Sequence, residues 1–200
     1  MLFRYLHISA VSLVLAFAIG LLTALCRLSG AFTAQALARF YLETSRNTPL
    51  LIQLFFIYFV VGPVLGLSRF PSAVLALSLF EGAYASEIFR AGIVSIPRGQ
   101  WEAGYSLGLS TFHTYRTIIL PQAIRRILPP LTSQAISLIK DSALVSTIAI
   151  YDLTMQAQAI ISETFLTFEL WFTVAAMYLV VTITLSIVVN RMERRFRVAA

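Results

Sequence analysis

Long apolar runs separated by short polar segments dominate this chain. The first run extends from Ile8 to Cys26 and the last from Leu170 to Asn190, and neither contains a charged residue. A helix needs about 20 mostly apolar residues to cross a bilayer. The pattern therefore predicts an all-α membrane protein with five transmembrane helices in a single domain, residues 1–200. The expected spans are 8–26, 33–61, 72–95, 126–150 and 168–190.

Prolines interrupt two of these predicted spans. Pro49 lies inside the second, and Pro129 and Pro130 lie near the start of the fourth. Proline lacks a backbone donor and clashes with the preceding helical turn. We therefore expect a kink or a late helix start at both places.

The segment WEAGYSLGLSTFHTYRTIILPQA, residues 101–123, is too polar to span a bilayer and too regular for a slack loop. Its pattern predicts a short helix from Gln100, a left-handed turn at Gly108 and a second helix that Ser110 caps. We expect Pro121 to end that second helix. Trp101 and Tyr105, four residues apart, are expected to form one exposed aromatic ridge.

Charge orients the chain in the membrane. The composition is 58% hydrophobic and 12% charged, with a net charge of +6 and a mean hydropathy of +0.83. Of the 14 arginines, twelve fall on one side of the predicted spans and two, Arg4 and Arg69, on the other. Cytoplasmic loops carry the excess of basic residues. This predicts an outside N-terminus, a cytoplasmic C-terminus and a cytoplasmic loop at 96–124.

The same composition excludes several function classes. A single cysteine and two distant histidines leave no disulfide framework and no metal site, and no nucleophile–base pair for catalysis is visible. The arginines flank apolar runs, so they indicate membrane topology and not nucleic-acid binding. No phosphate-binding GxxxxGK[ST] motif is present, so the chain itself has no ATP site. A cleaved signal peptide is the alternative for the first run, but Arg27 follows it like a stop-transfer flank.

Three charged residues lie at similar depth inside predicted spans, namely Glu81, Lys140 and Asp141. Intramembrane charges are costly, and they pair with one another or line a pathway. In one interpretation Lys140 neutralises Glu81 between helices, and in the other some of these groups contact a charged ligand in a pathway. Glu87 with Arg90 is expected to be an ordinary i,i+3 pair. The candidate pathway set is Glu81, Tyr84, Gln134, Ser137, Lys140, Asp141 and Ser142.

The cytoplasmic segment resembles a known motif. Glu102-Ala103-Gly104, then Gly108, Ile118 and Leu120-Pro121 reproduce the spacing of the EAA motif of ABC importer permeases, with Gly104 where alanine is usual. RNTPLLIQLF (46–55), GAYASEIFRAGIVSIPRGQWEA (82–103) and LIKDSALVSTIAIYDL (138–153) are similar to the polar-amino-acid subfamily. The residues expected to dock an ATPase are Gly99, Gln100, Trp101, Glu102, Ala103, Gly104, Tyr105, Gly108, Leu120 and Pro121.

This resemblance implies a type I ABC importer permease fold, with a cytoplasmic coupling helix between spans three and four. It implies partners: ABC ATPase subunits that hold ATP and Mg²⁺, a second permease subunit, a solute-binding protein, an amino-acid substrate and the lipid of the bacterial inner membrane. No cofactor is expected in this chain. The alternative function is an ion-coupled amino-acid carrier that uses the buried carboxylates.

Overall fold

The computed structural model describes the backbone of residues 2–196 and the side chains of residues 7–191. This part of the chain is helical and contains no strand. The helices are α1 (Leu2–Leu28), α2 (Phe32–Arg46), α3 (Leu50–Phe56), η1 (Ile57–Val61), α4 (Gly62–Leu65), α5 (Arg69–Val94), α6 (Arg98–Ser106), α7 (Thr111–Thr114), η2 (Tyr115–Ile119), α8 (Leu120–Asp141), η3 (Ser142–Ile148), α9 (Leu153–Thr164) and α10 (Thr167–Phe196).

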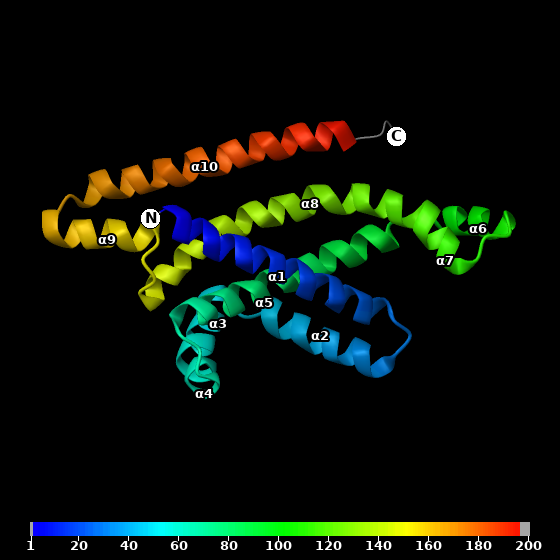
Figure 1. The fold of residues 1–200 in the computed structure, drawn as a ribbon, viewed down its shortest axis with the longest axis horizontal. Coiled ribbons are helices and arrows are strands. Elements are labelled where there is room, and N and C mark those ends of the chain that lie inside the picture. Colours follow the sequence, from blue (N-terminus) through cyan, green and yellow to red (C-terminus); the bar gives the residue numbers. More distant parts are fainter. Residues whose placement is uncertain (1, 197–200) are drawn as a thin grey trace.

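Three helices in the described part are long and apolar enough to cross a membrane: His7–Leu28, Arg69–Val94 and Thr167–Arg191. They correspond to the first, third and fifth predicted spans. Two bent pairs of helical segments also pass this test, so up to five spans are present if each pair counts as one. In Figure 1, α6 and α7 project from one end of the long helices, and the α9–α10 turn lies at the other end.

The second predicted span, 33–61, is not one continuous helix. Phe32–Arg46 and Leu50–Leu65 meet at an angle of 108°. The break falls at Asn47 to Pro49, where Pro49 has an extended backbone, with φ −58° and ψ 140°. A residue before proline is pushed out of the helical region by the proline ring. The sequence predicted an interruption here, but the structure makes it a sharp turn.

The fourth predicted span, 126–150, differs at both ends. An uninterrupted helical segment runs from Thr111 to Ile148, and it meets α9 at 47°. Pro129 and Pro130 lie inside α8 without ending it. The expectation that Pro121 ends the preceding helix is therefore wrong.

A widened helical turn explains why the chain continues through Pro121. η2 is π-helical, and the Leu120 N–H donates to the carbonyl of Tyr115 five residues back. The Leu120 N–H thus pairs one carbonyl further back than in an α-helix, and the helix then continues through Pro121, which has no N–H to donate. η1 precedes Pro63 in the same way, with the Gly62 N–H bonded to Ile57. Each π turn thus ends two residues before a proline.

Small residues let α1 and α5 pack closely along each other. A Cβ at Gly20 would lie 2.7 Å from the Cβ of Ala85, and one at Gly82 would lie 3.2 Å from the Ala16 carbonyl oxygen. Small side chains are the usual basis of helix association in membranes, because they let the two backbones approach. The α1–α5 pair is therefore the packed centre, and α2, α3 and α8 pack against it.

Candidate functional site

The segment predicted to be cytoplasmic forms a compact helical unit, α6 and α7, beyond the end of α5 (Figure 1). Pro97 precedes α6 with an extended backbone, so the chain turns before the helix begins. Gly108 adopts φ +74°, as its sequence position predicts. The Ser110 Oγ accepts a hydrogen bond from the His113 N–H at 3.4 Å and caps α7. The predicted helix–glycine–helix arrangement is confirmed, with α6 starting at Arg98 instead of Gln100.

The glycine that departs from the EAA motif has a partner across this unit. Gly104 is buried against Thr114, and a Cβ on Gly104 would lie 2.5 Å from Thr114 Cγ2 and 3.1 Å from Thr114 Cβ. Thr114 is itself fully buried. A β-branched side chain is stiff at χ1, so Thr114 cannot rotate away cheaply. Glycine at position 104 therefore lets Thr114 lock α6 onto α7.

The predicted aromatic ridge is split between two sides of α6. Trp101 turns inward, with its ring 6.2 Å from that of Tyr115, and packs on the cluster of Ile96, Ile119 and Ala123. Tyr105 is 47% exposed. Two rings at i and i+4 are offset by about 40° around a helix, and the apolar cluster covers only the Trp101 side.

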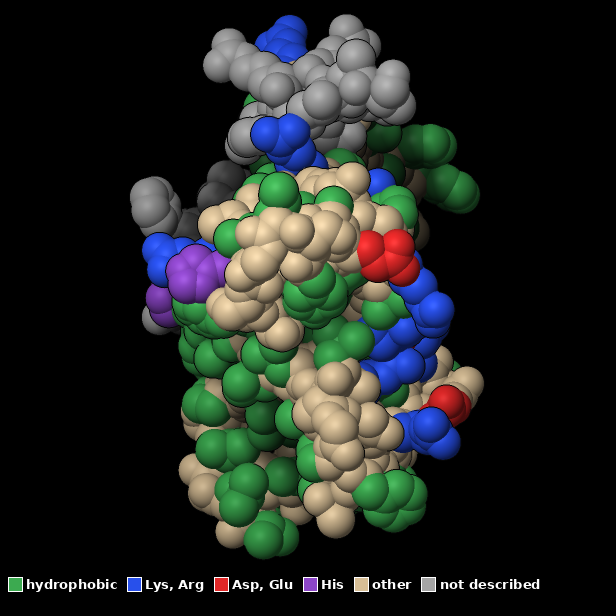
Figure 2. All heavy atoms as spheres, turned by 90° about the vertical axis from the view of Figure 1, so that its right-hand side faces the viewer, with side chains coloured by type: hydrophobic (Ala, Val, Ile, Leu, Met, Phe, Trp, Pro, Cys, Tyr) green, Lys and Arg blue, Asp and Glu red, His purple; other side chains and the backbone are tan. Residues whose placement is uncertain are grey.

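An outer surface remains available on the α6–α7 unit. It consists of the exposed residues Glu102, Ala103, Tyr105, Leu107 and Phe112. Figure 2 views this end of the molecule and shows hydrophobic and uncharged side chains in its centre, with Lys and Arg side chains gathered along one side. Gln100 is exposed beside this surface, and its Oε1 accepts from Gln122 Nε2 at 3.0 Å. We call these five residues the outer face of α6–α7.

The remaining motif residues serve other positions. Gly99 lies in the first turn of α6 and is exposed. Leu120 and Pro121 begin α8, behind the π turn η2. They connect the unit to the long helix and do not belong to its outer face.

The buried polar residues of α5 and α8 meet in the middle of the molecule. Glu81 is only 1% exposed, and its Oε2 accepts a hydrogen bond from Gln134 Nε2. The Asp141 carboxyl also interacts with Glu81. The other Glu81 oxygen, Oε1, has no hydrogen-bond partner within the described part of the chain. Two members of the predicted pathway set on α8, Gln134 and Asp141, thus face Glu81.

The interpretation in which Lys140 neutralises Glu81 is wrong. Lys140 is exposed, and no ion pair joins it to Glu81 in the described structure. Adjacent residues of a helix point about 100° apart. Because Asp141 faces Glu81, Lys140 faces away. Ser142, at the start of η3, is buried; its Oγ donates to the Ile139 carbonyl oxygen at 2.8 Å and accepts from Ser9 Oγ of α1 at 3.2 Å. Ser137, on α8, is half-buried.

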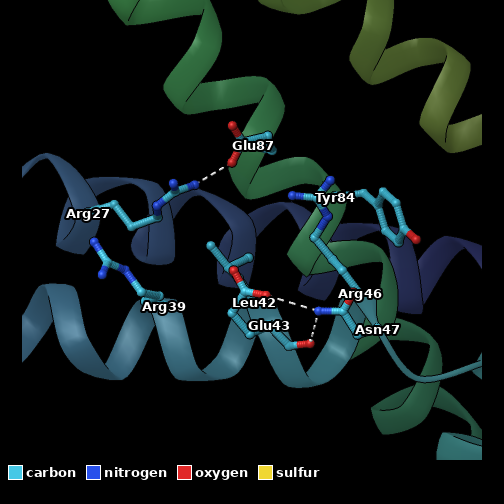
Figure 3. A pocket seen from close by; sticks show the side chains of 8 residues that line it. All are labelled: Arg27, Arg39, Leu42, Glu43, Arg46, Asn47, Tyr84 and Glu87. Atoms are coloured by element: carbon cyan, nitrogen blue, oxygen red, sulfur yellow. Dashed lines mark hydrogen bonds and ion pairs between the residues drawn. The ribbon is translucent and has the colours of Figure 1, made fainter.

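Two adjoining cavities lead away from this cluster. One, of about 430 Å³, is lined by Gln134 together with Tyr84, Arg46 and Glu87. The other, of about 330 Å³, shares Tyr84, Arg46 and Glu87 and continues to Arg39. Figure 3 shows this second cavity between α1, α2 and α5. Together the cavities extend from Gln134, past a largely apolar stretch beside Ile88 and Ala91, to a charged cavity near the end of α1.

Glu87 stands where the two cavities meet. It pairs with Arg90, as its i,i+3 spacing predicts, and also with Arg27 from the end of α1. Sequence reasoning missed the Arg27 pair, because nothing in the local spacing indicates how α1 and α5 align. It also missed Arg39, Glu43 and Arg46, which line the cavity from α2. Their spacing of four and three residues places them on one face of a helix, and this could have indicated a shared charged site.

An all-helical chain with membrane-spanning helices, a small helical unit protruding beyond them and buried acidic residues inside fits a membrane transport subunit. The sequence profile of the family "Binding-protein-dependent transport system inner membrane component" matches residues 16–198. The chain belongs to this family of inner-membrane transport components. It is a permease subunit and not the ATPase, since ATP hydrolysis in ABC transporters lies in separate subunits.

Curated relatives and solved structures agree with this assignment. The chain is 41% identical over 196 residues to the glutamine transport system permease protein GlnP of Escherichia coli K12, covering 96% of this chain and 90% of that protein. It is 40% identical over 190 residues to the L-cystine transport system permease protein TcyB of Bacillus subtilis, covering 94% and 81%. The crystal structure of an amino acid ABC transporter with histidines matches with a TM-score of 0.91 at 39% identity, covering 97% of this chain and 91% of that one. An inward-facing MetNI methionine transporter shares the fold, with a TM-score of 0.82 at 18% identity over 98% and 94% of the two chains.

Proposed function

We propose that this chain is the membrane-spanning subunit of an ATP-driven importer of polar amino acids. Relatives that cover nearly its whole length are named as glutamine and L-cystine permeases, and the similar solved structure is an amino acid ABC transporter. In this proposal ATPase subunits, which hold ATP and Mg²⁺, bind the outer face of α6–α7. A solute-binding protein delivers the amino acid on the opposite side.

One observation carries the mechanism: the helical segment from Thr111 to Ile148 is continuous. Its first turn is clamped to α6 by the Thr114–Gly104 contact, and its far half carries Gln134 and Asp141, which face Glu81. A rigid element transmits a displacement along its whole length. Movement of α6–α7 by a closing ATPase therefore shifts the side chains around Glu81, which is a rigid-body gating transition.

The topology follows the arginines. Five spans result if each bent pair crosses once, and twelve of 14 arginines then lie on the α6–α7 side. In this proposal the N-terminus is outside and the C-terminus is cytoplasmic, because cytoplasmic loops carry the excess of basic residues. A second permease subunit, identical or paralogous, completes the pathway in this proposal. α10, of whose most apolar stretch only 6% is buried, faces lipid or that subunit.

The substrate passes Glu81, Tyr84, Gln134 and Asp141 in this scheme. Glu81 and Asp141 are the acidic groups of the pathway, and the unpartnered Glu81 oxygen is an acceptor for an ammonium group. Lys140, Ser137 and Ser142 lie on the same helical segment but outside this contact.

The test is reconstitution of the permease with its genetically neighbouring ATPase and binding protein in liposomes. We expect ATP hydrolysis to rise when the binding protein is loaded with an amino acid, together with uptake of that amino acid. A preparation in which the permease forms no stable complex with the ATPase would contradict the proposal. Uptake that persists without ATP, driven by a proton gradient, would favour the ion-coupled carrier instead.

A further inference from the structure

The 330 Å³ cavity of Figure 3 is lined by an arginine, Arg39, that has no ion-pair partner among the described residues. Its two carboxylates are engaged: Glu87 by Arg27 and Arg90, and Glu43 by Asn47, whose Nδ2 donates at 3.0 Å. Within the described part of the chain, Arg39 makes no hydrogen bond or ion pair. In Figure 3 its side chain rises from α2 into the space below Arg27.

A second arginine is oriented by an aromatic ring. Arg46 places its guanidinium carbon 5.5 Å from the centre of the Tyr84 ring. This cation–π contact holds the group in place without using any of its hydrogen-bond donors. Like Arg39, Arg46 makes no ion pair in the described structure. The cavity thus presents two guanidinium groups whose donors are free, one at each end of the same helix face.

The charge balance of the lining points to an anion. Three arginines and two glutamates line the cavity, so it carries one net positive charge, and Arg90 adds to this from behind Glu87. A guanidinium forms its strongest pairs with planar carboxylates, which accept two parallel hydrogen bonds. The volume also lies in the range of small-molecule sites, ~300–1,000 Å³.

We infer that this cavity is a binding station for a carboxylate, with Arg39 as the principal ligand and Arg46 as the second. Under the proposed function, on which this inference rests, the carboxylate is the α-carboxylate of an amino acid that has left Glu81 towards the cytoplasm. The two stations are then complementary, since the acidic cluster receives the ammonium group and the basic cavity receives the carboxylate. A phospholipid headgroup phosphate offers the same anionic chemistry, and the experiment separates the two sources.

The experiment measures arginine modification by phenylglyoxal in the nucleotide-free complex of permease and ATPase in nanodiscs of neutral lipid. Peptide mass spectrometry follows Arg39, with Arg125 as an exposed reference on the same predicted side. The probe is an equimolar mixture of common L-amino acids, without arginine and cysteine, which react with the reagent. A second probe is the same mixture as α-amides, which lack the carboxylate.

We expect the amino acids to slow modification of Arg39 at least threefold, the amides to have no effect, and Arg125 to be unchanged. Protection by phosphatidylglycerol in the nanodisc, but not by amino acids, would overturn the amino-acid assignment and identify a lipid site. Equal modification of Arg39 and Arg125 under all conditions would overturn the carboxylate site altogether. Because this readout needs no transport, it is separate from failure of the proposed function.

Variants supply a second readout. Arg39→Gln removes the charge from an exposed position and is expected to slow uptake at least tenfold, since a hydrogen bond to a charged group contributes about 1.5–3 kcal/mol, or roughly 10–100-fold. Arg39→Lys keeps the charge but loses the planar guanidinium group, so its uptake rate should lie between those of the wild type and Arg39→Gln. Arg125→Gln is the matched control and should change uptake less than twofold. Wild-type uptake by Arg39→Gln would contradict the inference.

Discussion

At the scale of single residues, the α6–α7 unit depends on two glycines, each for a different physical reason. Gly104 is constrained by a neighbour, because Thr114 fills the space that a side chain would need. Gly108 is constrained by its own backbone, since its φ is +74° while no atom lies within 4 Å of its Cβ position. Substitutions at the two positions are therefore expected to fail in different ways.

Gly104→Ala restores the residue usual in the EAA motif and should nevertheless destabilise this protein. Alanine gains about 1 kcal/mol of helix propensity, but overpacking against Thr114 costs about 1–3 kcal/mol. We expect a lower thermal unfolding temperature of the purified permease. The double variant Gly104→Ala/Thr114→Ala should recover wild-type stability, and Ala103→Gly, on the exposed side of α6, should show only the propensity loss. Failure of the second substitution to rescue would refute the packing argument.

Gly108→Val should uncouple ATP hydrolysis from uptake. A β-branched residue is strongly disfavoured at positive φ, at a cost of about 1–3 kcal/mol, so the turn between α6 and α7 rearranges. Gly108→Asn should retain most activity, because asparagine tolerates the left-handed conformation. Both are measured as transported amino acid per ATP hydrolysed. Equal behaviour of valine and asparagine would show that backbone conformation is not the constraint.

At the scale of elements, two helix surfaces matter: the face of α1 that packs on α5, and the outer face of α6–α7, to which we propose that an ATPase binds. The first is a contact between small residues at backbone distance, and the second is a surface exposed in this chain. The first should govern folding, and the second should govern assembly.

Gly20→Leu should disrupt the α1–α5 pair. Any side chain at this position meets Ala85 at 2.7 Å and the backbone of α5 at 3.0 Å, and backbone cannot move aside as a flexible side chain does. We expect a reduced yield of the protein in membranes and a loss of about 1–3 kcal/mol or more in the free energy of unfolding. Thermal unfolding in detergent measures this loss. Gly30→Leu is the control, since no atom lies within 4 Å of its Cβ position. A normal Gly20→Leu protein would disprove the close contact.

Glu102→Lys should weaken ATPase binding while leaving the permease folded. Glu102 is exposed and forms no ion pair in the described structure, so the change costs the permease little. Reversing a charge at an interface opposes association. We expect loss of the ATPase from the complex during gel filtration. Glu163→Lys, an exposed reversal on α9 at the other end of the molecule, should keep the ATPase; equal loss from both would refute a specific role for Glu102.

At the scale of the whole molecule, one long helical segment joins the α6–α7 unit to the buried polar cluster around Glu81. This helical segment, Thr111 to Ile148, begins in the α6–α7 unit and extends past the residues that face Glu81. A cavity lined by Arg126, Pro130 and Gln134 follows the same helix between these two ends. We therefore expect substitutions at either end of the segment to impair ATP-driven uptake. Changes at the α6–α7 end should also weaken ATPase binding, whereas changes near Glu81 should not.

Glu81→Gln and Asp141→Asn change the inner end. Each removes a potential charge while keeping shape and hydrogen bonding, so the fold and the ATPase complex should survive. We expect at least a tenfold loss of uptake in each variant, measured in proteoliposomes, with ATPase binding retained. Glu163→Gln is the control. If both inner variants transport normally, the cluster serves only to hold α5 against α8.

Much of the α6–α7 unit could be predicted, because the residues that fix its turn and its helix cap act within a few positions along the chain. Gly108 and Ser110 occupy positions that fix backbone dihedrals and caps within a few residues, and both predictions are confirmed. The Glu87–Arg90 pair is likewise set by helix spacing alone. The expectation that a helix ends at Pro121 was wrong, because a π turn precedes the proline and the helix continues through it into α8.

The sequence by itself determined that this is a helical membrane protein of a binding-protein-dependent importer, since apolar run length, arginine placement and motif spacing are properties of the chain in order. Only the tertiary structure decided that Asp141 rather than Lys140 meets Glu81, that Thr114 fills the space beside Gly104, and that α2 delivers Arg39 to a cavity with α1 and α5. These contacts depend on how each helix is rotated and how deeply it packs. Rotation and depth are set by the sum of many weak side-chain contacts between distant segments, so no local pattern specifies them.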